Sequence, residues 1–141
     1  MKKSVPETAG QGVRLEHVGL NLKDPQAVTD WYCENLGMKV VRSQPGQGVF
    51  FISDAGGHMM LELYNNPKSP VPDYPAIEHL SLHISFMVHP VEVIRTRLIG
   101  AGARPVGEIG TNPSGDKVAN LRDPWGIPIQ LIERAEPMLR L

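Results

Sequence analysis

Two stretches of the chain, RLEHVGLNL at residues 14–22 and AIEHLSLHI at residues 76–84, share one pattern. Each has an aliphatic residue, then Glu, then His, and then aliphatic residues that alternate with small or polar ones. The histidines are His17 and His79, which lie 62 positions apart (79 − 17 = 62). Alternation with a period of two predicts a half-buried strand in each copy, with the polar positions on one face. We therefore predict an internal duplication of one small module.

A helix is predicted after each of these strands. In the stretch DPQAVTDWYCENLGM (residues 24–38), Asp24 can cap a helix, Pro25 suits its first turn and Gly37 can end it. The stretch HPVEVIRTRLIGAGARPV (residues 89–106) carries aliphatic residues at helical spacing and then glycines. Three short strand-like stretches, separated by turn residues, follow each helix. The order of elements predicts an α+β fold built from two half-domains that share a core.

This order gives boundaries along the chain. We expect a flexible polar leader over residues 1–12 and one domain over residues 13–134, followed by a C-terminal tail at 135–141. Within the domain, module one spans 13–64, a proline-rich linker spans 65–75 and module two spans 76–134.

The composition excludes several classes of partner. Lys plus Arg number 14 and Asp plus Glu number 15, so the charge is nearly balanced, which argues against a nucleic acid or an anionic membrane as the main partner. No apolar run approaches the ~20 residues that span a bilayer. The leader has no apolar signal-peptide core, and the single cysteine fits a reducing compartment, so we expect a cytoplasmic protein.

Three residues of the predicted strands could bind a metal. His17 and His79 occupy equivalent positions on polar strand faces, and a duplicated fold brings equivalent residues toward the axis between its modules. Glu62 lies between Leu61 and Leu63, in a strand where an unpaired carboxylate would be costly to bury. Two imidazoles and one carboxylate can hold a divalent first-row metal with coordination positions left open.

Two segments, EHVGLNLKDPQAVTDWYCENLGMKVV from residue 16 and DPWGIPIQLIE from residue 123, resemble the vicinal oxygen chelate superfamily. This superfamily includes glyoxalase I, extradiol dioxygenases and bleomycin resistance proteins, and the resemblance covers residues 14–134. It implies two tandem βαβββ modules that form a curved, cup-shaped mixed sheet with helices on the outer face. It is a poor guide to one particular reaction.

The resemblance also implies a set of ligands, which are His17, Glu62, His79 and a fourth residue. In the family, the fourth ligand is a glutamate four positions after the glycine of the DP-x-G motif. That position holds Gln130 in this chain, and glutamine can offer an oxygen to a metal but cannot act as a base. We prefer Gln130 as the fourth ligand, with Glu133, brought inward by a bulge, as the alternative.

Substrate contacts are predicted from the same strand faces. Glyoxalase I-like sequences usually carry an arginine that binds glutathione where this chain has Asn21, so the resemblance does not extend to glutathione recognition. His83 is the counterpart of Asn21 in the repeat, and we expect both to face the cup. Met60 and Tyr64 share the strand face of Glu62 and would form part of the wall of the site.

Three functions are compatible with these residues. The leading hypothesis is a metal-dependent lyase or isomerase related to glyoxalase I, which acts on a small substrate with vicinal oxygens through a metal-stabilised enediolate, with Glu62 as the catalytic base. The alternatives are an Fe(II) extradiol-type dioxygenase and a non-catalytic protein that binds a drug or toxin. The implied cofactor is one divalent ion among Zn, Ni, Mn, Co and Fe. The expected partners are a small molecule and a second copy in a homodimer, and either one chain or two could build the cup.

Overall fold

The computed structural model describes residues 12–139 of the chain, in eight strands, two α-helices and two short 3-10 helices. The first half contains β1 (His17–Asn21), α1 (Pro25–Leu36), β2 (Lys39–Gln44), η2 (Pro45–Gln47), β3 (Val49–Ser53) and β4 (Met60–Tyr64). The connection contains η3 (Tyr74–Ala76). The second half contains β5 (Ile84–Met87), α2 (Val91–Gly100), β6 (Arg104–Thr111), β7 (Lys117–Arg122) and β8 (Pro128–Glu133).

Each half forms its own four-stranded mixed sheet. The strand order is β1-β4-β3-β2 in module one and β5-β8-β7-β6 in module two. The first strand of each module runs parallel to the last, and the remaining neighbours are antiparallel. The two sheets therefore have the same topology, and the predicted α+β fold of two tandem βαβββ modules is confirmed.

The ends of the helices follow from local chemistry. Asp24 caps α1 because its carboxylate accepts a hydrogen bond from the Ala27 amide at 3.0 Å, and Gly37, with φ 65°, ends the helix in the left-handed conformation. The helix α2 has no side-chain cap of its own. Glu133 of β8 supplies one instead, since its Oε2 accepts a hydrogen bond from the Val91 amide at 2.8 Å.

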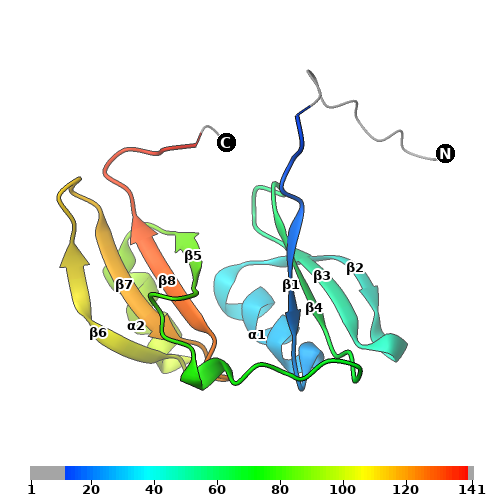
Figure 1. Cartoon of the computed structure of the whole chain (residues 1–141). Helices are drawn as coiled ribbons and strands as arrows, with labels where there is room; N and C mark the ends of the chain where they lie inside the picture. Colours follow the sequence, from blue (N-terminus) through cyan, green and yellow to red (C-terminus); the bar gives the residue numbers. More distant parts are fainter. Residues whose placement is uncertain (1–11, 140–141) are drawn as a thin grey trace.

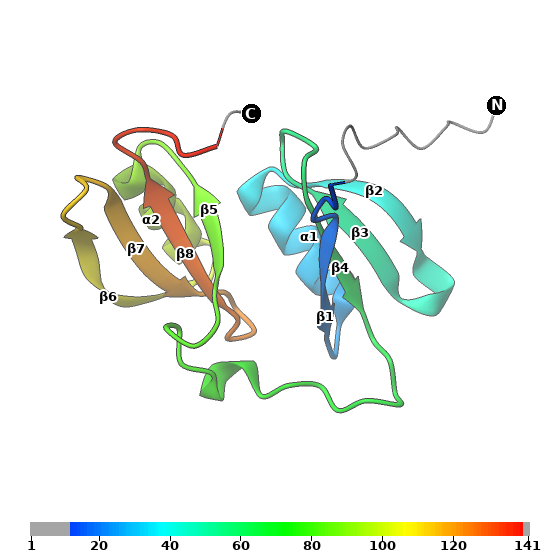
Figure 2. The same ribbon diagram turned by 45° about the horizontal axis from the view of Figure 1, so that its top comes forward.

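One hydrophobic core joins the two modules. In Figures 1 and 2, α1 lies between the two sheets. The Trp31 indole on α1 donates a hydrogen bond of 2.9 Å to the carbonyl of Ala101, which directly follows α2. The Tyr32 ring lies 6.2 Å from that of Phe86 on β5, measured between centroids. The helix-covered sides of both sheets thus contribute to the shared core, and the uncovered side of each sheet, called here its open face, points away from that core.

The internal repeat has a different register from the one predicted. The helices begin at Pro25 and Val91, which is a separation of 66 residues (91 − 25 = 66). The strand pairs agree with this separation: Gly19 is opposite Glu62, and Ser85 is opposite Gln130 (85 − 19 = 66).

The predicted strand at residues 76–84 is wrong over residues 76–83. The strand β5 begins only at Ile84, and His79 lies in turns that follow η3. The amides of Ser81 and Leu82 both donate to the Glu78 carbonyl, so this part of the backbone bonds to itself and not to a neighbouring strand. The similarity of the two Glu-His stretches therefore does not mark equivalent positions, and the structural counterpart of His17 is His83 (83 − 17 = 66).

Neither α1 nor α2, the two α-helices of the described part, is long and apolar enough to cross a membrane. Residues 1–11 of the predicted leader and residues 140–141 of the predicted tail lie outside the described residues.

Candidate functional site

The open face of module one carries the side chains that alternate with the core residues of its strands. Neighbouring strands place these side chains in rows, because residues paired across a sheet share a face. One row contains His17, Met60, Ser53 and Lys39; a second contains Gly19, Glu62, Phe51 and Arg42; a third contains Asn21, Tyr64, Val49 and Gln44. Glu62 stands near the centre of this face.

His17 and Glu62 are in contact. The Nε2 atom of His17 lies 3.1 Å from Oε2 of Glu62, and its Nδ1 atom lies 2.9 Å from Oε1 of Glu16. Carboxylates only accept hydrogen bonds, so both contacts are hydrogen bonds only when the imidazole carries both protons. Since the His17 side chain is 35% exposed and that of Glu62 27% exposed, water and ligands can reach this pair.

Two aromatic side chains flank the pair. The Phe51 ring packs edge-on against the His17 ring, with 5.4 Å between centroids and 88° between planes. Tyr64 lies over Gly19, where a Cβ atom would come within 3.2 Å of Tyr64 Cε1. The absence of a side chain at Gly19 therefore lets the tyrosine ring lie close to β1 and beside Glu62.

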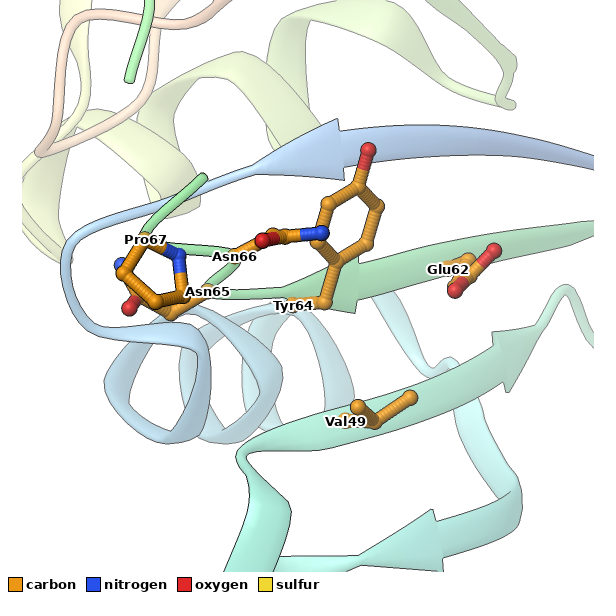
Figure 3. Close-up of a pocket in the computed structure, with 6 residues that line it drawn as sticks. All are labelled: Val49, Glu62, Tyr64, Asn65, Asn66 and Pro67. Atoms are coloured by element: carbon orange, nitrogen blue, oxygen red, sulfur yellow. The ribbon is translucent and has the colours of Figure 1, made fainter. Parts of the chain in front are cut away.

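A shallow pocket adjoins these residues. It has a volume of about 360 Å³ and is lined by Val49, Glu62, Tyr64, Asn65, Asn66 and Pro67. Figure 3 shows Glu62 and Tyr64 projecting from β4 on the same side, with Val49 on the neighbouring strand and residues 65–67 at one end. The pocket thus combines a carboxylate, a phenol and amide groups with the apolar side chains of Val49 and Pro67.

The open face of module two carries different chemistry. Its central row is Ser85, Gln130, Asn120 and Val106. The Ser85 hydroxyl donates to Oε1 of Gln130 at 3.0 Å, and Nε2 of Gln130 donates to Oδ1 of Asn120 at 3.4 Å. This row is neutral, and both ends of the Gln130 amide are engaged within it.

His79 and His83, which precede β5, contact each other and not the His17–Glu62 pair of module one. Nδ1 of His83 lies 2.7 Å from the carbonyl oxygen of His79, and Nδ1 of His79 lies 4.0 Å from a carboxylate oxygen of Glu78. The structure therefore brings together His17 and Glu62 among the predicted ligands, and it places His79 and Gln130 with other partners.

Two further predicted site residues, Asn21 and Glu133, stabilise the fold through hydrogen bonds to the backbone. The Asn21 amide nitrogen donates to the carbonyls of Asn66, Ser69 and Pro70, and its oxygen accepts from the Asn66 amide at 2.8 Å. Asn21 thus fastens the linker to β1. Glu133 caps α2 and contacts Nδ1 of His89 at 3.2 Å, so its carboxylate is directed to the start of α2 and not to the open face.

The buried carboxylate Asp123 connects the modules below the open faces. Its Oδ2 accepts a hydrogen bond of 2.7 Å from the Tyr32 hydroxyl, and its Oδ1 accepts from the amides of Trp125 and Ile127. Burial raises the pKa of Asp123, although these hydrogen bonds oppose the shift. Burial, followed by the proximity of Asp123, raises the pKa of Tyr32 well above its usual value. The Asp123 carboxylate is fully buried, and its hydrogen bond with Tyr32 stabilises the packing between the modules.

The fit of a metal ion can be judged from the donors present. Within residues 12–139, no group of three or more His, Cys, Asp or Glu side chains could hold an ion. His17 and Glu62 provide two donors, and the oxygen of Gln130 already accepts a hydrogen bond on the other sheet. The four predicted ligands of one chain therefore do not form a metal site by themselves.

Sequence reasoning missed two residues of module one's open face, Phe51 and Arg42. Phe51 could have been found, because it alternates with the buried residues Phe50 and Ile52. Arg42 could not, because a shift of strand register between Val40 and Arg42 decides which residue of β2 stands beside Phe51.

Known proteins agree with this architecture. The family model for the Glyoxalase/Bleomycin resistance protein/Dioxygenase superfamily matches residues 14–131. No curated protein sequence matches the chain.

Solved structures share the fold at low sequence identity. The antibiotic-binding protein TnmS3 from Streptomyces sp. CB03234 is 22% identical with a TM-score of 0.69, and the match covers 89% of this chain and 98% of that one. A superfamily member from Sphaerobacter thermophilus is 16% identical with a TM-score of 0.69, covering 87% and 98%. A glyoxalase family protein from Bacillus cereus is 18% identical with a TM-score of 0.66, covering 92% and 98%. The chain belongs to the Glyoxalase/Bleomycin resistance protein/Dioxygenase superfamily.

Proposed function

We propose that the protein binds a small organic molecule on the open face of module one, with the His17–Glu62 pair at the centre of the site. The observation that carries this proposal is the contact of 3.1 Å between the two side chains on an uncovered sheet face, beside the pocket of Tyr64 and Asn65. An accessible carboxylate, an imidazole and two aromatic rings can orient a ligand through hydrogen bonds and apolar contact. TnmS3, which shares the fold of this chain, is an antibiotic-binding protein, and this supports small-molecule binding as the class of function.

The experiment is a fragment screen followed by protein NMR. Ligands are expected to perturb backbone amides of β1, β3 and β4, and binding should weaken at least about tenfold in Glu62→Gln because a charge-assisted hydrogen bond is lost. The matched control is Gln130→Asn, which shortens the corresponding residue of module two and should leave binding unchanged. Perturbations confined to β5 and β8, or full binding by Glu62→Gln, would disprove the proposal.

A homodimer belongs to the same proposal. Both open faces are uncovered in a single chain, and apolar side chains stand exposed on β5 and just before it, namely Met87 at 53% and Leu82 at 51%. A second copy that covered these faces would bury them and enclose the ligand. Sedimentation equilibrium tests this directly, and a strict monomer at high protein concentration would exclude it.

A metal-dependent reaction of the glyoxalase or dioxygenase kind is the second candidate. The feature that favours it is the pairing of His17 with Glu62, together with His83 at the position equivalent to His17 in the repeat. Because one chain brings only two of these donors into contact, such a site would need donors from a second chain. Titration with Zn, Ni, Mn, Co and Fe(II) tests it, with His17→Ala and His83→Ala as variants. If both variants bind metal as the wild type does, this candidate fails.

A further inference from the structure

The outer strand of module one changes register beside the site. Val40 of β2 is opposite Ile52 of β3, and Arg42 is opposite Phe51, so Val41 is an extra residue between the two pairs. A bulge of this kind shifts the alternation of side chains by one position. Without it, Val41 would stand opposite Phe51. The bulge therefore places an arginine on the open face in a position where regular pairing would place a valine.

Arg42 completes a row with three kinds of chemistry. Along Glu62, Phe51 and Arg42, the sheet presents a carboxylate, a phenyl ring and a guanidinium on three adjacent strands. Adjacent strands lie about 4.8 Å apart, so the backbones that carry the two charges are about 10 Å apart. Direct pairing of the two charged groups is not found: the Arg42 guanidinium makes no hydrogen bond or ion pair with any described residue, and the residue is exposed.

Each member of the row has a free binding group. Glu62 uses Oε2 for His17, and no hydrogen bond to Oε1 is found among the described residues. The Phe51 ring is half-buried and is held edge-on by His17, which fixes the orientation of its face. A guanidinium binds a carboxylate or phosphate through two parallel hydrogen bonds.

We propose that the ligand of this site is an aromatic zwitterion that lies across the row. Its cationic amine donates to Glu62, its ring packs on Phe51 and its anionic group binds Arg42. This inference rests on the proposed function and adds the class of ligand to it. In module two the corresponding row is Ser85, Gln130, Asn120 and Val106, which carries no charge, so the same ligand is not expected there.

The test uses four small probes on the full chain, with binding followed by NMR. The probe 4-(aminomethyl)benzoate carries the ring and both charges, benzylamine lacks the anion, benzoate lacks the cation, and trans-4-(aminomethyl)cyclohexanecarboxylate lacks the aromatic ring. The first probe should bind at least about tenfold more tightly than each of the others, because each of those lacks one of the three contacts.

The variants separate this inference from the proposed function. Arg42→Gln should weaken 4-(aminomethyl)benzoate about tenfold and leave benzylamine unchanged, since benzylamine does not reach the guanidinium. Arg104→Gln, on the exposed outer strand of module two, is the matched control and should change neither.

Equal affinities for the four probes, no binding of any of them, or an Arg42→Gln variant that binds as the wild type does would each overturn the proposal. If unrelated fragments still perturb β1, β3 and β4, the proposed function stands and only the class of ligand is wrong. If no fragment perturbs module one, the proposed function fails as well.

Discussion

Module one places Glu62 opposite Gly19, and module two places Gln130 opposite Ser85 at the same point of the same topology. In the first module the carboxylate contacts an imidazole and stays accessible, whereas in the second the amide is engaged by a hydroxyl and a second amide. The backbone is thus repeated, and the chemistry of its open faces is not. A duplicated fold provides two open faces, and the side chains at a few equivalent positions decide what each open face can bind.

Substitution of the aspartate in the turn before the last strand is expected to give the largest difference in stability between the modules. Asp123 accepts hydrogen bonds from Tyr32, Trp125 and Ile127 and is fully buried, whereas Asp54 occupies the turn before β4 and is partly exposed. Asp123→Ala should lower the free energy of unfolding by about 3 kcal/mol, because it leaves buried donors without an acceptor. Asp54→Ala should cost less than about 1 kcal/mol. Urea denaturation measures both, and equal losses would contradict the comparison.

The next largest difference in stability is expected for substitutions at the end of the first strand of each module. Asn21 holds Asn66, Ser69 and Pro70 of the linker, whereas its counterpart Met87 is half-exposed. Asn21→Ala should lower the free energy of unfolding by about 2 kcal/mol and make the linker more sensitive to proteases. Met87→Ala should stay within about 0.5 kcal/mol of the wild type. Limited proteolysis with denaturant melts provides the measurement, and an unchanged linker in Asn21→Ala would refute this role.

A smaller effect is expected at the residues opposite Glu62 and Gln130. In Gly19→Ala, the new Cβ would lie 3.2 Å from Tyr64 Cε1 and 3.8 Å from Glu62 Oε2, so the tyrosine ring has to move. We expect ligand binding to weaken about threefold, with little change in stability. Ser85→Ala loses one hydrogen bond in module two and should leave binding unchanged. An equal loss of ligand affinity in both variants would contradict a binding site on module one alone.

The smallest expected effect is a pH dependence that belongs to module two. The Ala135 amide, followed by Asn112 and Arg134, lowers the pKa of Asp116 below its usual value of 3.8. The stability from this group is therefore present above a pH of about 4 and is lost as the pH falls through the lower pKa of the folded state. Asp116→Asn should be less stable at neutral pH and should lose less of its stability between neutral and acidic pH. Denaturation at a series of pH values tests this, and two parallel stability curves would disagree with it.

Much of the fold could be predicted because its signals are local. Asp24, Pro25 and Gly37 fix the ends of α1 through hydrogen bonding and backbone conformation within a few residues. The alternation around Glu62 identified β4 and its open face correctly. His17 and Glu62 could be paired in advance because both belong to regular strands that are neighbours in the sheet.

The register of the repeat could not be predicted in the same way. The residues 76–83 imitate a strand in their pattern, but no neighbouring strand pairs with them, so they bond locally before β5 begins. The predictions for His79, as the counterpart of His17, and for His83, as the counterpart of Asn21, depended on this register. The partners of Asn21 lie 45 or more residues away in the linker, and no local pattern indicates them.

The sequence by itself determined the number of modules, the order of their elements and the carboxylate of module one's open face, because these depend on periodicity, capping and composition. Only the tertiary structure decided that His83 is the counterpart of His17, that Gln130 lies in a neutral row and that Arg42 stands beside Phe51. The physical reason is that strand register arises from hydrogen bonds between distant segments. A shift of one residue in that register moves a side chain from one face of the sheet to the other.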